Sequence, residues 1–377
     1  MASVLEDRIL RRLSKLQQRH RFRQLSSSSG IDLTSNDYLS LSDHPEIRKA
    51  MVKALEDGLP LGSGGSRLLR GNTPWHIELE QRLAAFKHAE SALIFNSGFE
   101  ANVGVLSTLC RPGDLVFADR LVHASMIDGM RQSKADLQFF PHNDMAALSG
   151  MLASATGAGA RFIVAESLYS MDGDHAPLDE LAALANQHDA YLIIDEAHAT
   201  GVFGERGSGL LEHFGLENTP LVTVHTCGKA WGSFGAFISC SRPVKEYLVN
   251  HCRPFIFTTA LPPLLPVQWL AILEILEKET WRREKVLAHA ARLRAALADL
   301  IHFDGIATPI IPIVLGDESR TLAAAQYCQD AGFDIRAIRP PSVPKGTSRL
   351  RIALHAGLKD RDLVRLIQVC RQILKGD

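Results

Sequence analysis

A carboxylate, a lysine and two histidines each follow a short apolar run in this sequence. Asp195 and His198 end the stretch "AYLIIDEAHATG", Lys229 follows "LVTVHTCG", and His123 follows "LVFADRLV". Short apolar runs bounded by polar residues and glycines are typical of buried strands. Because the carboxyl ends of parallel strands meet at one edge of a sheet, we expect these four side chains to lie close together.

Each of these residues also has an ordinary structural interpretation. Asp195 alone would cap a helix, His123 alone would hydrogen-bond within the protein, and Lys229 alone would be a solvated surface charge. Their convergence at successive strand ends outweighs those interpretations. A lysine flanked by Gly228 and Trp231 is also poorly placed as a surface charge. We therefore interpret the group as a reactive site.

The set suits the chemistry of pyridoxal phosphate (PLP). A lysine amine condenses with the aldehyde of PLP, and a carboxylate keeps the pyridine nitrogen protonated so that the ring acts as an electron sink. A flat imidazole can stack on that ring. The stretch "NSGFEAN" places Ser97 and Gly98 at a predicted helix start, where backbone N–H groups bind phosphate. Hydroxyls at nearby strand ends, such as that of Thr226, complete such a cradle.

The elements that must position these residues alternate between strand and helix. Strands are predicted at 91–98, 115–120, 137–144, 161–167, 191–197, 220–226 and 235–240. Several of these runs are apolar throughout, which is typical of strands buried on both faces. Strands and helices in turn imply an α/β fold with a mostly parallel sheet covered by helices.

The chain divides into three segments by this pattern. Residues 1–40 are predicted as an N-terminal helix with a short strand segment, 41–270 as a large α/β domain, and 271–377 as a smaller C-terminal α+β domain. One continuous helix is expected from about Leu264 to Leu300, with prolines only in its first turn, where they are tolerated.

Composition excludes several classes of protein. The 377 residues carry a net charge of -1. The chain thus lacks the excess of positive charge that is typical of proteins that bind nucleic acid or an anionic membrane surface. The apolar runs are shorter than a membrane-spanning helix requires, and the basic N-terminus lacks the apolar centre of a secretory signal. The six cysteines lack the paired spacing of a zinc site or a disulfide framework. We therefore expect no metal, and free thiols in a cytoplasmic protein.

Several stretches resemble those of the α-oxoamine synthases, which are PLP enzymes of fold type I. They are "NDYLSLSDHP" (36–45), "GSGGSRLLRGNTPWHIELEQRLAAF" (62–86), "FNSGFEANVG" (95–104), "DRLVHASMIDGMRQS" (119–133), "SLYSMDGDHAPL" (167–178), "DEAHATGVFGERGSG" (195–209), "TCGKAWGSFGA" (226–236), "FTTALPP" (257–263) and "AIRPPSVPKGTSRLRIAL" (337–354). Together they cover nearly the whole chain and are specific, although none would be specific alone. The resemblance implies a large, mostly parallel-sheet domain and a smaller C-terminal α+β domain.

The resemblance also implies a role for each matching position around the cofactor. Lys229 resembles the Schiff-base lysine, which also removes a proton from the substrate Cα. Asp195 resembles the partner of the pyridine nitrogen, and His123 resembles the histidine stacked over the ring. His198 would contact the phenolic oxygen of the ring, with Ser170 near it.

The phosphate cradle implied by the family consists of Gly98, Phe99 and Thr226, with Thr258 supplied by a second subunit. A homodimer with its active site at the subunit interface follows from that assignment.

A further set of residues is implied to bind the substrate. Arg351 resembles the clamp for the amino-acid carboxylate, which an arginine binds through two parallel hydrogen bonds. The other implied contacts are Asn36, Arg21, Arg339 and Ser342. Arg19 and Arg23 qualify as well as Arg21, because the family arginine near the end of the first helix cannot be placed uniquely.

Within the family, the string "AIRPPSVPKGTSRLR" and the short length look most like the member that condenses L-alanine with a pimeloyl thioester and releases CO2. The thioester would be carried on CoA or on acyl carrier protein. One alternative keeps the cofactor but uses glycine and acetyl-CoA. A second is a non-catalytic partner subunit, which the presence of Lys229 disfavours. A third, a doubly wound nucleotide-binding protein, lacks the expected GxGxxG after a first strand.

Overall fold

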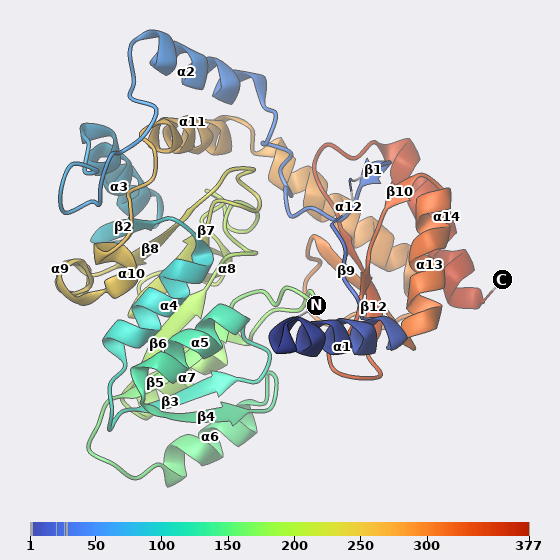
Figure 1. The fold of residues 1–377 in the computed structure, drawn as a ribbon, viewed down its shortest axis with the longest axis horizontal. Coiled ribbons are helices and arrows are strands. Elements are labelled where there is room, and N and C mark those ends of the chain that lie inside the picture. The colour runs from blue at the N-terminus through green and yellow to red at the C-terminus, as the bar shows by residue number, and fades with distance from the viewer. Residues whose placement is uncertain (1–2, 20, 26, 28, 377) are drawn as a thin grey trace. The chain divides into compact units, whose positions relative to one another are not determined.

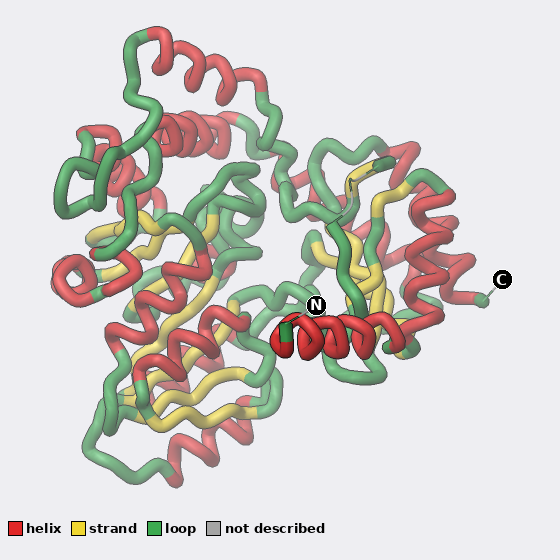
Figure 2. Tube along the Cα trace, in the orientation of Figure 1, coloured by secondary structure: helices red, strands yellow, loops and turns green. Residues whose placement is uncertain are grey.

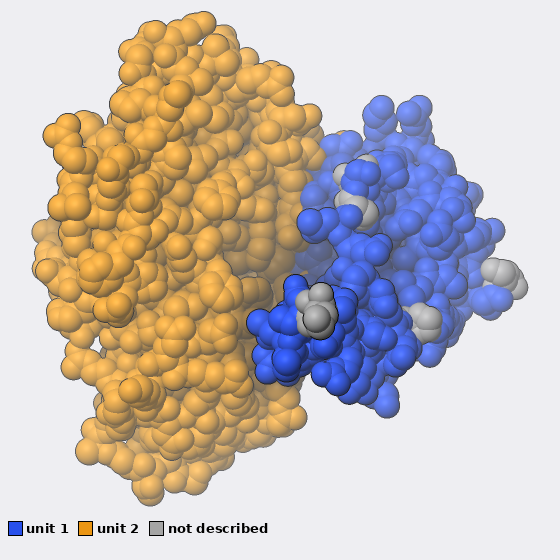
Figure 3. All heavy atoms as spheres, in the orientation of Figure 1, with its two compact units in different colours: residues 1–35, 171–173, 288–377 blue, residues 36–170, 174–287 orange. Residues whose placement is uncertain are grey.

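The computed structural model describes residues 3–19, 21–25, 27 and 29–376. The chain forms two compact units, coloured separately in Figure 3. Unit 1 comprises residues 1–35, 171–173 and 288–377, and unit 2 comprises residues 36–170 and 174–287. The sequence pattern divides the chain at residues 40 and 270, whereas the structure groups the N-terminal residues with the C-terminal ones.

A seven-stranded sheet forms the centre of unit 2 (Figures 1 and 2), in the order β2–β8–β7–β6–β5–β3–β4. The strands are β2 (Ser91–Phe95), β3 (Leu115–Asp119), β4 (Asp136–Phe140), β5 (Arg161–Glu166), β6 (Ala190–Asp195), β7 (Val222–Thr226) and β8 (Ala236–Cys240). Strand β8 runs antiparallel to both of its neighbours, and the other neighbouring pairs are parallel. The predicted mostly parallel α/β sheet is therefore confirmed, and the carboxyl ends of the strands other than β8 meet at one edge.

Helices supply the layers that bury this sheet. Helices α4 (Gly98–Leu109) and α5 (Ala124–Ser133) pack on one face, where Val105 and Met126 join the core formed with Ile193 of β6. Each large apolar side chain buried in this way contributes about 1.5–3 kcal/mol. The other helices of unit 2 are α2 (Pro45–Glu56), α3 (Pro74–Phe86), α6 (Met145–Ser154), α7 (Leu178–Gln187), α8 (Leu210–His213), α9 (Arg242–His251), α10 (Arg253–Ile256) and α11 (Leu264–Lys278).

The prediction of a single helix over residues 264–300 is wrong. Helix α11 ends at Lys278, and α12 (Trp281–Leu297) begins after a break. Glu279 leaves the helical region, with φ of -114° and ψ of 54°. Its carboxylate accepts a hydrogen bond from Nε of Arg282 over 2.6 Å. Hydrophobic periodicity does not reveal this contact, because the pattern of apolar residues continues through the break.

Unit 1 is built on a small antiparallel sheet with the order β11–β12–β9, and on a parallel pair of strands, β1 and β10. Its elements are α1 (Val4–Gln18), β1 (Ile31–Asp32), β9 (Ile310–Gly316), α13 (Glu318–Asp330), β10 (Phe333–Asp334), β11 (Ala337–Ile338), β12 (Ser348–Ala353) and α14 (Asp360–Lys375). The pairing of Ile31 with Phe333 joins the N-terminal residues to this unit. Within the described part of the chain, no helix is both long and apolar enough to cross a membrane.

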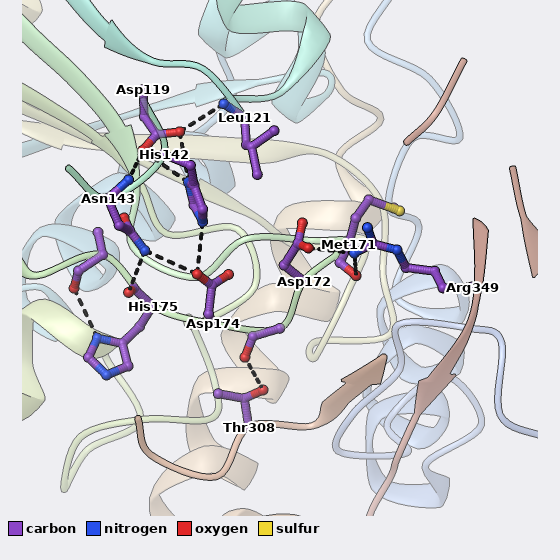
Figure 4. Close-up of polar contacts among 12 residues, drawn as sticks. Asp119, Leu121, His142, Asn143, Met171, Asp172, Asp174, His175, Thr308 and Arg349 are labelled. Atoms are coloured by element: carbon purple, nitrogen blue, oxygen red, sulfur yellow. Dashed lines mark hydrogen bonds and ion pairs between the residues drawn. The ribbon is translucent and has the colours of Figure 1, made fainter. Parts of the chain in front are cut away.

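A three-residue segment, 171–173, also belongs to unit 1, and Figure 4 shows polar contacts that hold it. Nη1 of Arg349 donates to the carbonyl of Met171 over 3.1 Å and to the carboxylate of Asp172 over 2.5 Å. Thr308 donates its hydroxyl to the carbonyl of Gly173 over 2.7 Å. Gly173 has a φ of +68°, and a Cβ there would lie 2.3 Å from a backbone oxygen. Only glycine fits this position.

Candidate active site

Asp195 ends β6 and is buried, with 5% of its surface exposed. Side chains alternate along a strand, so Asp195 points to the same face as Ile193, where α4 packs. Nδ2 of Asn102, on α4, donates to Oδ2 of Asp195 over 2.7 Å, and the N–H of Ala197 donates to Oδ1 over 2.8 Å. Two such donors stabilise an ionised carboxylate. That ionised form is what a protonated pyridine nitrogen requires.

Glu166 lies directly opposite Asp195 on β5, and the sequence analysis missed it. Burial, followed by the charge of Asp195, raises the pKa of Glu166 well above its usual value, and the charge of Lys229 acts in the opposite direction. Two adjacent buried carboxyl groups do not both ionise at low cost. The raised pKa of Glu166 favours its protonated form, beside an Asp195 carboxylate that accepts two N–H donors.

Lys229 lies in the turn between β7 and β8. The N–H of Gly232 donates to the Lys229 carbonyl over 2.8 Å, and the neighbouring Trp231 is fully buried, with its ring against that of Phe237. The turn is thus anchored beside a half-buried lysine. The effect of the Lys229 charge on the pKa of Glu166 places Lys229 near the pair of carboxyl groups.

His123 precedes α5 as its N-cap residue. Its Nδ1 lies 2.7 Å from Oγ of Ser125, and Oγ lies 3.0 Å from Nδ2 of Asn102. Partial burial of the ring and the charge of Lys229 lower the pKa of His123, whereas Asp195 opposes that change. The structure thus brings His123, Lys229 and Asp195 together.

Two further predicted residues lie on loops of unit 2. His198 is buried, and its Nδ1 lies 2.7 Å from the hydroxyl of Tyr38. That hydroxyl also lies 3.1 Å from Oδ1 of Asn36, so one tyrosine connects a predicted cofactor residue with a predicted substrate residue. Ser170 is half-buried in the loop that follows β5.

A charged histidine holds the loop that carries Ser170 (Figure 4). Nδ1 of His142 lies 2.9 Å from Oδ1 of Asp119, at the end of β3, and Nε2 lies 2.8 Å from Oδ2 of Asp174. Although burial lowers it, the two hydrogen-bonded carboxylates raise the pKa of His142 to about 10. His142 therefore stays protonated at neutral pH and ties the loop to β3. We name Asp119, His142 and Asp174 the histidine bridge.

The start of α4 and the end of β7 form a cradle for an anion. Oγ of Ser97 accepts the N–H of Glu100 over 3.1 Å, which leaves the N–H groups of Gly98 and Phe99 directed out of the first turn. A Cβ on Gly98 would lie 3.5 Å from Cβ of Thr226. The helix start and the Thr226 hydroxyl are therefore adjacent, as a phosphate site requires.

Thr258 lies close to this cradle within its own chain. Nδ2 of Asn96 donates to Oγ1 of Thr258 over 2.8 Å and to the carbonyl of Thr259 over 3.0 Å. Asn96 immediately precedes the residue that caps α4.

Glu196, to which the sequence analysis assigns no role, is fully buried beneath this edge of the sheet. Its Oε2 lies 3.1 Å from Nζ of Lys87, and its Oε1 accepts the N–H of Leu211 over 2.9 Å. Nζ of Lys87 also donates to the carbonyl of Ser208. The pair therefore joins the end of α3 to the loop that follows Asp195.

The predicted substrate residues fall in both units. Asn36 lies in unit 2, whereas unit 1 contains Arg21, Arg339, Ser342 and Arg351. Arg351 is buried on β12. Arg21 forms an ion pair of 2.8 Å with Glu318, while Nη2 of Arg23 donates to Oγ of Ser342 over 2.9 Å. Of the three arginines left open by the sequence, Arg23 thus contacts another predicted substrate residue.

The donors of unit 2 fit PLP. A buried carboxylate with two N–H donors, a lysine, a histidine and a helix start beside a threonine match the nitrogen, aldehyde, ring and phosphate of that cofactor. Among the residues that the structure describes, no group of three or more His, Cys, Asp or Glu side chains is arranged to hold a metal ion.

Comparisons with known proteins agree with this chemistry. Residues 28–369 match the family model for aminotransferase class I and II. A relative from Anaeromyxobacter dehalogenans (strain 2CP-1), named 8-amino-7-oxononanoate synthase, is 47% identical over 335 residues, which is 88% of this chain and 83% of the relative.

Solved structures show the same likeness. A serine palmitoyltransferase from S. paucimobilis with PLP and myriocin bound has a TM-score of 0.90 at 29% identity, covering 100% of this chain and 99% of that one. An 8-amino-7-oxononanoate synthase from Francisella tularensis has a TM-score of 0.79 at 29% identity, covering 93% and 98%. These findings confirm the resemblance drawn from the sequence. The chain belongs to the aminotransferase class I and II family and, within it, to the PLP-dependent α-oxoamine synthases.

Proposed function

We propose that this chain condenses L-alanine with a pimeloyl thioester and releases CO2, forming 8-amino-7-oxononanoate on the route to biotin. The observation that carries the proposal is the placement of Asp195 and Lys229 at one edge of the sheet, beside the anion cradle at Gly98. The choice of substrates is supported by relatives with 39% to 47% identity that bear the name of this synthase.

PLP, when bound, supplies an electron sink for the negative charge that develops at the substrate Cα. Asp195 would hold the pyridine nitrogen, because its charge is sustained by the donors from Asn102 and Ala197. His198 and Ser170 would bind the phenolic oxygen. The phosphate would be held by Gly98, Phe99 and Thr226, and by Thr258 of the partner subunit.

Lys229 is the proposed acid and base of the reaction. An amine at this position can take a proton from Cα of the amino acid and return it later. His123 would stack on the cofactor ring, which restricts the ring to one orientation. Fixed orientation of the reacting groups removes much of the entropic barrier to forming a carbon–carbon bond.

The carboxylate of L-alanine is proposed to bind Arg351. A buried guanidinium on a regular strand presents a rigid fork that matches a carboxylate. Asn36, Arg339 and Ser342 are the further proposed substrate contacts. Arg23 joins this group through its hydrogen bond to Ser342, whereas Arg21 is engaged by Glu318.

The proposed assembly is a cytoplasmic homodimer with Thr258 at a shared active site. Large exposed apolar side chains support an interface: Phe257, which precedes Thr258, is 72% exposed in the single chain, and Leu61 and Leu69 are 81% and 79% exposed. Exposed apolar surface of this kind marks a contact with another protein. Sedimentation of the purified protein tests the assembly, and a monomer with full activity would contradict it.

The substrate proposal is tested by steady-state kinetics. L-alanine, glycine and L-serine are each paired with pimeloyl-CoA, pimeloyl acyl carrier protein and acetyl-CoA. We expect the highest kcat/KM for L-alanine with one of the pimeloyl thioesters. A preference for glycine with acetyl-CoA would replace these substrates while leaving the family unchanged.

The role of Lys229 is tested by absorbance. The purified protein should show a visible band from the bound cofactor, and Lys229→Ala should lose that band together with activity. A matched control is Lys245→Ala, because Lys245 pairs with Glu80 on α3 and should leave the band unchanged.

A further inference from the structure

Four side chains form a continuous hydrogen-bonded series in unit 2. Nδ2 of Asn102 lies 2.7 Å from Oδ2 of Asp195 and 3.0 Å from Oγ of Ser125. Oγ of Ser125 then lies 2.7 Å from Nδ1 of His123. Asn102 and Ser125 are buried, with 2% and 0% of their surfaces exposed. Asp195 is buried too, whereas His123 is exposed, so water is excluded from the Asp195–Asn102–Ser125 part of the series, and there the direction of each hydrogen bond is determined by its neighbours.

The direction starts at Asp195. An ionised carboxylate only accepts hydrogen bonds, so Asn102 must turn its NH2 group toward Asp195. The reverse orientation would place Oδ1 of Asn102 against the carboxylate oxygen. In the observed orientation Oδ1 is buried and has no partner among the described residues. The amide thus uses both N–H groups, one on Asp195 and one on Ser125.

The direction continues through Ser125 to His123. Because the Ser125 hydroxyl accepts from Asn102, its own hydrogen is available to Nδ1 of His123. The backbone N–H of Ser125, which can only donate, lies 3.3 Å from the same Nδ1. Two independent donors therefore hydrogen-bond to Nδ1 of His123, and this nitrogen must carry a lone pair and no hydrogen.

We propose that Asn102 and Ser125 form a one-way relay from Asp195 that holds the His123 imidazole neutral, with its hydrogen on Nε2. Asn102 and Ser125 are positioning residues, since they act on the ring through hydrogen bonds and not on the substrate. The relay links the residue for the pyridine nitrogen to the residue for the ring face, so the two are oriented together. A protonated His123 would need a hydrogen on Nδ1, which both donors oppose. The lowered pKa of His123 agrees with this arrangement.

The proposal rests on the proposed function only for the statement that His123 faces the cofactor ring. Its test uses the nitrogen atoms of His123 and requires no turnover, so it can fail while the proposed reaction holds. Conversely, the proposed reaction can be wrong while the relay exists, because a different substrate would leave these hydrogen bonds intact.

The test is 15N NMR of the full chain labelled at histidine, with and without PLP. His123 signals are assigned by their loss in His123→Asn. In the unaltered protein we expect Nδ1 without hydrogen and Nε2 with hydrogen. In Ser125→Ala the ratio of the Nε2–H form to the other forms should fall roughly tenfold, the factor that corresponds to one lost hydrogen bond in a buried site.

The matched control is Ser133→Ala. Ser133 is buried on the same helix, and its hydroxyl donates to the carbonyl of Met130 over 2.6 Å. This change should leave the His123 signals as they are. Asn102→Ala tests the relay from its other end and should shift the signals in the same direction as Ser125→Ala. Hydrogen on Nδ1 in the unaltered protein, or unchanged His123 signals in both relay variants, would overturn the proposal.

Discussion

Two ionic groups support the same sheet edge of unit 2, and they differ in their access to water. In the Lys87–Glu196 pair the side chains are 3% and 0% exposed. In the histidine bridge the side chains of His142 and Asp174 are 24% and 30% exposed. When one partner is lost, water can solvate His142 or Asp174, and the buried Asp119 keeps hydrogen bonds from the N–H groups of Leu121 and Asn143, whereas water reaches neither partner of the pair. Burial, more than the number of charges, therefore sets how much each group contributes when it is broken.

The largest effect is expected for Lys87→Met. It leaves Glu196 buried without its cation, and such a loss costs about 3–5 kcal/mol of unfolding free energy. Urea unfolding of the variant and the unaltered protein measures the difference. The double variant Lys87→Met/Glu196→Gln should recover part of it, because no unpaired charge then remains. Equal stability of Lys87→Met and the unaltered protein would contradict the expectation that burial sets how much an ionic group contributes.

Asp195→Asn should follow in size. The amide keeps the shape of the side chain but removes the charge beside the pyridine nitrogen. Loss of one such electrostatic contact lowers kcat by about 100–1000-fold. Steady-state kinetics at saturating PLP measures this effect, and the matched change Asp144→Asn, at the exposed cap of α6, should leave kcat unchanged. A comparable loss in both variants would indicate a general defect and not a role for Asp195.

His142→Gln should have a smaller effect than Lys87→Met, of about 2 kcal/mol, because solvent reaches the bridge and charged hydrogen bonds there are partly screened. It also loosens the loop that carries Ser170, so the affinity for PLP should fall. Equilibrium binding followed by cofactor absorbance measures this change. Unaltered affinity together with lowered stability would restrict the bridge to a structural role.

The bridge should also make stability depend on pH. The pKa of His142 is raised from 6.5 to about 10 in the folded chain, so its stabilisation is complete below about pH 6.5 and is lost as pH rises toward 10. Burial raises the pKa of Asp119, but its hydrogen bonds, of which the one from His142 has the largest effect, bring that pKa below its ordinary value. The stabilisation that comes from the lowered pKa of Asp119 is therefore lost only as pH falls below about 4. The stability difference between unaltered protein and His142→Gln, measured across pH, should shrink between pH 6.5 and 10.

The smallest effect is expected at an exposed pair. Lys53 of α2 and Asp57, the C-cap residue of that helix, lie 2.8 Å apart, with side chains 74% and 64% exposed. Lys53→Ala should leave the urea midpoint within experimental error, because water and salt screen such pairs. A shift as large as that of His142→Gln would mean that burial does not decide the ranking.

Sequence patterns predict the central sheet and its edge well, for a physical reason. Strands buried on both faces are apolar throughout, so each run and the polar residues that follow it stand out along the chain. Asp195, His123 and Lys229 were found in this way. The same pattern missed the break at Glu279, because a helix break made by side-chain contacts leaves the apolar periodicity unchanged.

The supporting residues were not predictable by that route. Asn102 and Ser125 lie inside recognised motifs, but a polar residue in a helix is ordinary unless its partner is known. The partner of Asn102 is 93 residues away in the chain, and that of Glu196 is 109 residues away. Register between distant strands creates these contacts, and no local pattern encodes it. Glu166 shows the same limit, since its importance comes from lying opposite Asp195.

The division of the chain has a consequence for synthesis on the ribosome. All the residues of unit 2 precede Ala288, whereas unit 1 needs residues from both termini and the segment 171–173 held by Arg349 and Thr308. Unit 2 can therefore complete its sheet while the last part of the chain is still being made. Ile31 is synthesised long before its partner Phe333 and cannot pair with it until Phe333 has been made. Strand β1 is thus made before unit 2 but reaches its final place after it.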